Sequence, residues 1–305
     1  MKFGDEPRRI PLEDPGAIFR VSFHPDGTSL ALGLHAAVSL VGFPELTETG
    51  ALTSTRIRDD GDSVEVLRHS PDGRLLAVAG LSGRVLELVR LDNGSGDRAV
   101  VEGVSWAGFS PGSSTLVATG GDQSQVVDLE TEEPIWRLEG TPDEPDGCLA
   151  ALNAAGDHVA ALRANGAAID LVELSSGAVT TTFTGGPSSL RWLAFTSDDR
   201  YLVAFDRYAE SMAVWCPPRT SPHLPDSFGE LASYYWSAAC HPQGTHCARG
   251  MISGVLDLVD LRNGRIEDSR RVHSGRVLDL AFSPDGEHLV SAGEDGTVLV
   301  WPILP

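Results

Sequence analysis

The chain is poor in lysine and cysteine, and it has no long apolar run. Lys2 is the only lysine, so 22 of the 23 basic residues are arginine, against 43 acidic residues and a net charge of −20. Binding to DNA or RNA depends mainly on cationic contacts with phosphate, so no nucleic-acid partner is expected. No stretch approaches the roughly 18 apolar residues of a membrane span. The first 19 residues carry acids and prolines where a signal peptide needs an apolar run, so no membrane partner is expected either.

The four cysteines are too sparse for a disulfide framework. Cys148, Cys216, Cys240 and Cys247 form no Cys-x-x-Cys pair. This pattern indicates reduced thiols and favours a cytoplasmic protein. The excess of arginine over lysine, together with 33 glycines, is typical of a GC-rich bacterial genome.

One phrase recurs seven times: a short apolar run, a turn of the Pro-Asp-Gly type, and a second apolar run. Proline presets φ at the first turn position, and Asp and Gly suit the next, so the chain reverses between two strands. Successive turns are 40 to 46 residues apart. A period of about 40–45 residues is that of a four-stranded propeller blade. The turn-proline position is occupied in order by Pro25, Pro71, Pro111, Ala154, Ser197, Pro242 and Pro284.

These repeats predict an all-β chain folded as a single seven-bladed β-propeller over residues 1–305. Each blade is expected to contain four antiparallel strands, because no segment shows sustained helical periodicity. The last repeat ends after its third strand. We therefore predict that residues 7–14, and above all 8–13, supply its outer strand and close the ring, which removes exposed sheet edges.

The last repeat carries His273, Ser291, Asp295 and Trp301 at characteristic spacings. In these residues, and in the repeats along nearly its whole length, the chain resembles the WD-repeat family of β-propellers. The resemblance implies that the four side chains form a buried hydrogen-bond network, which is a structural role and not that of a Ser-His-Asp catalytic set. The other repeats match less well: Asp122 remains in the third and Trp215 in the fifth.

The resemblance also implies that the innermost strands begin on a top face where partner proteins or peptides dock. Aromatic and arginine side chains, the types enriched in binding hot spots, gather at these positions. We therefore predict a non-catalytic interaction scaffold without a cofactor, a monomeric ring within a larger assembly. The predicted partner-binding residues are Arg20, Trp106, Arg191, Trp192, Tyr235, Trp236 and Asp279.

The alternative is a propeller enzyme (a lyase, lactonase or hydrolase) or a small-ligand sensor, with its site at the mouth of the central channel. Such a site needs histidine and carboxylate side chains to converge from several repeats. The candidates are His35, Glu65, Arg68, His69 and Asp279. Because buried charge is costly unless paired, Arg68 is expected to meet a carboxylate such as Glu65 or to reach the channel.

The segment 240–247 contains Cys240, His241, His246 and Cys247, all possible zinc ligands. Zinc needs four convergent ligands, whereas neighbouring residues of a hairpin point to opposite faces. We therefore expect a structural hairpin, with a metal site or a Cys240–Cys247 crosslink as the alternatives.

Two acidic clusters and one proline-rich segment complete the candidates. The clusters at 59–62 and 142–147 lack calcium-loop spacing and are expected to be solvated turns. Residues 216–230 contain four prolines where an outer strand is due, so they form either a poor strand or a docking loop.

Overall fold

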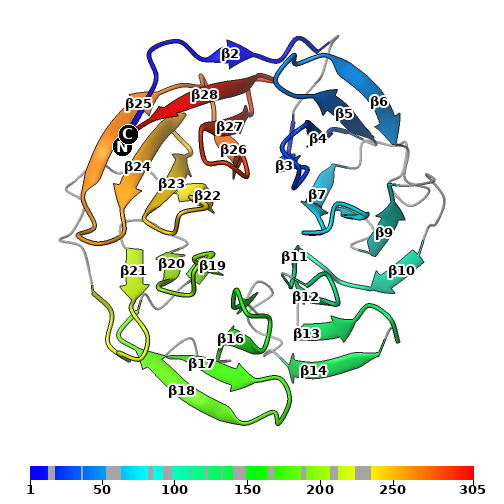
Figure 1. Cartoon of the computed structure of the whole chain (residues 1–305), viewed down its shortest axis with the longest axis vertical. Coiled ribbons are helices and arrows are strands. Elements are labelled where there is room, and N and C mark those ends of the chain that lie inside the picture. The colour runs from blue at the N-terminus through cyan, green and yellow to red at the C-terminus, as the bar shows by residue number, and fades with distance from the viewer. Residues whose placement is uncertain are drawn as a thin grey trace.

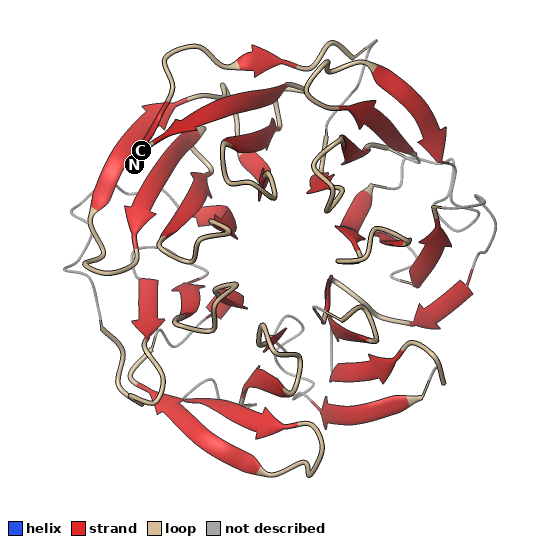
Figure 2. Cartoon of the chain, in the orientation of Figure 1, coloured by secondary structure: helices blue, strands red, loops and turns tan. Residues whose placement is uncertain are grey.

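Seven antiparallel sheets stand around one axis like the blades of a turbine (Figures 1 and 2). The computed structural model describes residues 1–12, 18–35, 37–52, 63–81, 85–91, 98–110, 112–120, 123–131, 133–139, 149–163, 168–186, 190–206, 212–223 and 235–305. Within these ranges there are strands and turns and no helix, which confirms the predicted seven-bladed, all-β fold. Accordingly, none of these residues forms a helix long and apolar enough to cross a membrane.

Five blades have four described strands, numbered from the axis outward, and consecutive strands pair with one another. The first blade contains β3 (Arg20–Phe23), β4 (Ser29–Gly33), β5 (Val38–Gly42) and β6 (Glu48–Leu52). The second contains β7 (Val64–His69), β8 (Leu75–Gly80), β9 (Leu86–Arg90) and β10 (Arg98–Val101). The third contains β11 (Trp106–Phe109), β12 (Thr115–Gly120), β13 (Gln123–Asp128) and β14 (Pro134–Glu139). The fourth contains β15 (Ala150–Leu152), β16 (His158–Leu162), β17 (Ala168–Glu173) and β18 (Val179–Thr184), and the sixth β22 (Tyr235–Cys240), β23 (His246–Met251), β24 (Val255–Asp260) and β25 (Ile266–Arg271).

The fifth blade differs from the predicted four-stranded pattern within the described residues. It contains β19 (Leu190–Phe195), β20 (Leu202–Asp206) and β21 (Met212–Trp215). Beyond β21, Pro217 and Pro218 remove two backbone donors, and only an isolated bridge joins His223 to Val214. The first part of the proline-rich segment is therefore not a regular strand, and its remainder, residues 224–230, lies outside the described ranges.

The N-terminus closes the ring on the seventh blade, which contains β26 (Val277–Phe282), β27 (His288–Gly293) and β28 (Val298–Leu304). Two short strands, β1 (Lys2–Phe3) and β2 (Arg8–Arg9), pair antiparallel with β28. Closure is as predicted, but pairing begins at Lys2, before the predicted span of 7–14. The physical reason is Phe3, which is fully buried and packs edge-on against Trp301, with ring centroids 5.9 Å apart.

The turns between the first and second strands of the blades lie together at one end of the ring, which we call the bottom face. Hydrogen bonds join neighbouring turns there. In the first blade, Gly27 has a φ of 74° and its N–H donates to His24 O at 2.9 Å. The ring of His24 then bonds the carbonyl oxygen of Gly73, in the next blade, at 3.1 Å. Backbone N–H groups of the fourth blade similarly donate to the carboxylate of Asp199 in the fifth. The repeated turn thus joins neighbouring blades as well as neighbouring strands.

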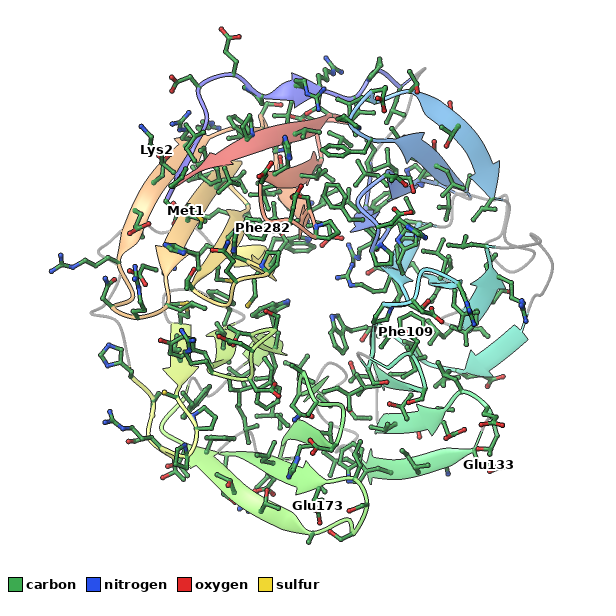
Figure 3. The ribbon with its side chains drawn as sticks, in the orientation of Figure 1. Met1, Lys2, Phe109, Glu133, Glu173 and Phe282 are labelled. Carbon is green, nitrogen blue, oxygen red and sulfur yellow. The ribbon has the colours of Figure 1, made fainter. Side chains whose placement is uncertain are left out.

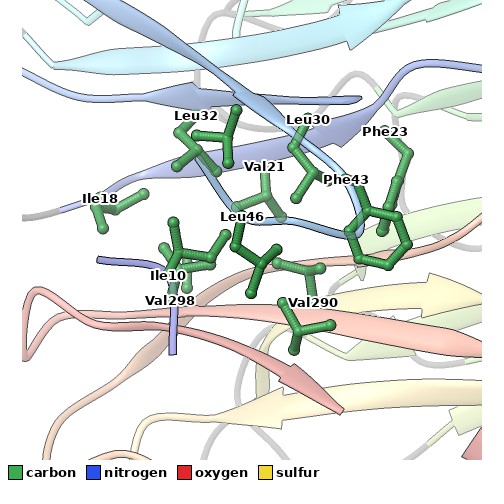
Figure 4. Close-up of a cluster of buried hydrophobic side chains, with 13 residues drawn as sticks. Ile10, Ile18, Val21, Phe23, Leu30, Leu32, Phe43, Leu46, Val290 and Val298 are labelled. Atoms are coloured by element: carbon green, nitrogen blue, oxygen red, sulfur yellow. The ribbon is translucent and has the colours of Figure 1, made fainter. Parts of the chain in front are cut away.

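The hydrophobic core is divided among the interfaces between neighbouring blades. One cluster joins the first and seventh blades through Val21, Leu30, Val290 and Val300, and Ile10 of the closing segment packs into it (Figure 4). Equivalent clusters fill the other interfaces, so side chains occupy the space between neighbouring sheets all around the ring (Figure 3). Because each blade is buried on both faces, the ring is rigid and function is left to its two ends.

Candidate functional site

A funnel of about 510 Å³ opens where the innermost strands begin, and we call this end the top face. Every blade contributes to its wall, because the start of each inner strand converges on the axis. Five of the seven predicted partner-binding residues line it: Arg20, Trp106, Trp192, Trp236 and Asp279. The other two, Arg191 and Tyr235, lie on β19 and β22, but their side chains are outside the described part of the chain.

Ion pairs cross between blades at the funnel wall. Arg20 Nη2 lies 2.6 Å from Glu65 Oε2, and Arg20 Nε donates to the Glu65 backbone carbonyl. Arg68 Nη1 lies 3.5 Å from Asp279 Oδ2, joining the second blade to the seventh. The sequence predicted that Arg68 meets a carboxylate such as Glu65 or reaches the channel. In the structure Arg68 lines the funnel and its carboxylate partner is Asp279, because Arg20 already occupies Glu65.

Each of the three tryptophans has a supporting contact. Trp192 packs on Phe205 with ring centroids 5.3 Å apart. The guanidinium of Arg276 lies over the Trp236 ring, 5.0 Å from its centroid. Trp106 lies across Gly108, where an added Cβ would come within 2.8 Å of the indole. The indoles are therefore held by packing in the wall, as a preformed binding surface requires.

Sequence reasoning missed Leu81, Arg276 and Glu294, which also line the funnel. Arg276 immediately precedes β26, and Leu81 and Glu294 immediately follow the second strands β8 and β27. Since the ends of second strands lie beside the starts of first strands, extending the repeat alignment to both positions would have found them.

The two histidines proposed for a channel-mouth site do not line the funnel. His35 stacks edge-on against Phe19, with ring centroids 4.8 Å apart. His69 lies farther along the inner strand, where its Nδ1 bonds Ser22 Oγ at 3.0 Å. Burial, followed by the nearby charge of His24, lowers the pKa of His69 to about 4.

The four residues matched to the family network lie in contact within the seventh blade. His273 Nε2 bonds Ser291 Oγ at 2.9 Å, and Trp301 Nε1 donates to the same oxygen at 3.3 Å. His273 Nδ1 lies 3.1 Å from Asp295 Oδ1. Partial burial would raise the pKa of Asp295, but hydrogen bonds from Thr297 and Ser274 and the charge of His273 lower it to about 2. His273, Ser291 and Trp301 are buried, Asp295 lies at the surface, and none of the four lines the funnel, which suits a structural role.

The possible zinc ligands of the sixth blade do not converge on one point. Cys240 lies opposite Cys247 in the β22–β23 register, and both are free thiols. His241 bonds the carbonyl oxygen of Gly286 at 3.0 Å, whereas His246 Nε2 bonds Glu267 Oε2 at 2.9 Å. The hairpin alternation expected from the sequence separates the two pairs.

A different group of three possible cation ligands lies near the closing strand. Ligand atoms of His246, Asp260 and Glu267 lie within 4.8 Å of one another. Protein cations already occupy the carboxylates: the Met1 ammonium lies 2.6 Å from Glu267, and Arg262 binds both oxygens of Asp260. The group is therefore a closed ion-pair cluster. The acidic clusters at 59–62 and 142–147, and Asp122, lie outside the described residues.

The comparisons with known proteins agree with this architecture. The family model described as "WD domain, G-beta repeat" matches residues 266–302, which contain the His273 network. The chain is 26% identical over 136 residues to the WD repeat-containing protein SL1-17 of Schistosoma mansoni, a match covering 44% of this chain and 43% of that protein. It is 27% identical over 138 residues to the Protein LST8 homolog of Drosophila melanogaster, again covering 44% of this chain and 43% of the relative.

The solved structures extend the likeness to the whole ring. The β-propeller domain of Cps50 (Swd1) from Myceliophteria thermophila superposes with a TM-score of 0.78 at 18% identity, covering 98% of this chain and 100% of that domain. This chain spans less than half of the two curated relatives named above. The final repeat thus matches the WD-repeat model, and the seven-bladed ring as a whole resembles the β-propellers of WD-repeat proteins.

Proposed function

We propose that the chain is a non-catalytic scaffold that binds a partner protein or peptide in the top-face funnel and acts in the cytoplasm as part of a larger assembly. The observation that carries this proposal is the convergence of Trp106, Trp192 and Trp236 on one hollow that all seven blades line. Preformed aromatic surface beside arginine is the chemistry of interface hot spots. WD-repeat propellers typically act in this way.

The second candidate is a small-ligand or catalytic site in the same funnel, because about 510 Å³ lies within the size range of ligand pockets. Catalysis would need an available acid or base near the substrate. The lining carboxylates Glu65 and Glu294 are already held by Arg20 and Arg276. No histidine of the described chain is among the lining residues. These observations favour binding over chemistry.

Site-specific photocrosslinking tests the scaffold proposal. A benzophenone amino acid is placed at Leu81, which is 47% exposed on the funnel wall, or at Val179, which is 53% exposed on the outer strand β18. In cells that naturally make the protein, we expect Leu81 to crosslink to a discrete protein and Val179 not to. Trp106→Ala and Trp192→Ala should reduce the Leu81 crosslink. Equal crosslinking from both positions, or turnover of a metabolite by the purified protein, would contradict the proposal.

A further inference from the structure

The funnel wall is divided into two arcs of different chemistry. Among the side chains that the structure describes, blades seven, one and two contribute the six charged lining residues: Arg20, Glu65, Arg68, Arg276, Asp279 and Glu294. Blades three to six contribute the tryptophans together with leucine and alanine side chains. An occupant that satisfies both arcs must carry an apolar body and a charged or polar tip.

Two of the three arginines in the charged arc each hydrogen-bond a glutamate through two of their nitrogens. Arg20 donates to the Glu65 carboxylate, the Glu65 carbonyl and the Phe19 carbonyl. Arg276 forms a two-point pair with Glu294, through Nε at 3.1 Å and Nη2 at 2.9 Å. The carboxylates of Glu65 and Glu294 are neutralised by the same contacts, so neither offers a free negative charge to a basic ligand.

In the remaining ion pair, between Arg68 and Asp279, the arginine is the more exposed side chain. The Asp279 side chain is 8% exposed, whereas that of Arg68 is 31% exposed. Asp279 also accepts the backbone N–H of Val21 at 3.0 Å. Arg68 Nη1 donates to the Leu67 carbonyl at 2.8 Å, but within the described chain its Nε and Nη2 have no hydrogen-bond partner. A guanidinium presents these donors as a planar fork that matches a carboxylate.

We propose that the funnel recognises an acidic side chain next to a bulky apolar residue on a partner peptide, with Arg68 binding the carboxylate and the tryptophan arc holding the apolar neighbour. This inference rests on the proposed scaffold function and names the chemistry of its ligand. In the described part of the wall, a basic peptide would meet three arginines and no unpaired carboxylate. A free small anion would be repelled by the net charge of −20 without the apolar contacts that a peptide brings.

Selection from a displayed library of random dodecapeptides, followed by titration of synthetic peptides, tests this inference. We expect peptides selected on the unmodified protein to carry Asp or Glu beside Trp, Phe or Leu. Replacing that Glu by Gln in the peptide should weaken binding about tenfold, because a charge-assisted hydrogen bond is lost. The same peptide change should have little further effect on the Arg68→Gln protein. The Arg68→Lys protein should bind the acidic peptide with an affinity between those of the unmodified protein and the Arg68→Gln protein, since lysine keeps the charge but loses the planar fork of donors.

Arg74→Gln is the matched control, because Arg74 belongs to the same blade, lies at its bottom turn and has a side chain that is 77% exposed. Melting temperatures establish that each variant is folded; if Arg68→Gln fails to fold, the Glu/Gln peptide pair still tests the inference on the unmodified protein.

Peptides that depend on Trp106 but show no acidic preference, or a basic one, would overturn this inference and leave the scaffold function standing. If binding of the selected peptides does not depend on funnel residues, both the acidic-peptide inference and the proposed scaffold function are contradicted. If 3-phenylpropionate, but not its amide, binds as tightly as the peptides, the occupant is a free carboxylate and not a peptide.

Discussion

Nε2 of His241 lies 3.0 Å from the carbonyl oxygen of Gly286, in the neighbouring blade. The same contact joins His24 of the first blade to Gly73 of the second at 3.1 Å. In both cases the histidine immediately precedes the turn proline. A residue that looks like a zinc ligand in the sequence thus serves to couple one blade to the next.

His241→Ala should therefore destabilise the protein by about 1–2 kcal/mol, because the buried Gly286 carbonyl loses its partner. Gln243→Ala is the matched control, since this exposed side chain belongs to the same turn. Urea unfolding measures both variants. Equal stability of the two would show that the inter-blade bond contributes nothing.

Removal of residues 1–14 should destabilise the whole ring, and Phe3→Ala should account for much of the loss. Phe3 is fully buried against Trp301, and truncating a buried phenylalanine costs about 3–5 kcal/mol. Lys2→Ala should be nearly neutral, because Lys2 is the exposed residue of the same strand. Thermal melts distinguish the cases, and an unchanged melting temperature in the truncated chain would refute closure as a source of stability.

Loss of the His273 ring should destabilise the seventh blade. His273→Ala leaves Ser291 Oγ and Asp295 without their central partner, at a cost of about 1–3 kcal/mol. Glu287→Gln, at an exposed position of the same blade, should unfold like the unmodified protein. Partner binding in the funnel should survive His273→Ala at temperatures where the protein remains folded; loss of binding without loss of structure would point to a functional role for this network.

Stability should fall as the pH falls from 6.5 towards 4. The folded-state pKa of His69 is lowered from 6.5 to about 4, so the unfolded chain takes up this proton first. The contribution of His69 to the free energy of unfolding is fully present above pH 6.5 and decreases by up to about 3 kcal/mol as the pH falls towards 4. His69→Gln removes this contribution and should reduce the pH dependence, measured as the free energy of unfolding at pH 4.5 and 7.5, while His241 and His273, whose pKa values are also lowered by burial, keep theirs. His158→Gln, whose histidine bonds Asp157 within its own turn, should keep the original slope.

Cys247 should resist alkylation until the protein unfolds. Burial, followed by the contact with the Cys240 thiol, raises its pKa well above the ordinary value, so little reactive thiolate forms. Cys216 is partly exposed and serves as the internal comparison. Iodoacetamide labelling followed by peptide mass mapping should show Cys216 modified first; equal rates would contradict the packing of the sixth blade.

The repeat spacing alone determined the number of blades, because each Pro-Asp-Gly turn marks one strand reversal and its period equals the length of a blade. The placement of Arg20, Trp106, Trp192 and Trp236 at strand starts was also readable, since a repeat puts equivalent positions at equivalent places. The sequence did not show which side chains meet across the axis, because those meetings depend on contacts between residues far apart in the chain.

Only the tertiary structure decided that Arg68 meets Asp279 while Arg20 takes Glu65, and that the hairpin histidines point to different neighbours. It also decided that strand pairing starts at Lys2, through the burial of Phe3 on Trp301. The physical reason is common to all three cases. Periodicity is a local property of the chain, whereas the pairing of charges and the filling of an interface depend on ring closure, which brings the first and last blades together.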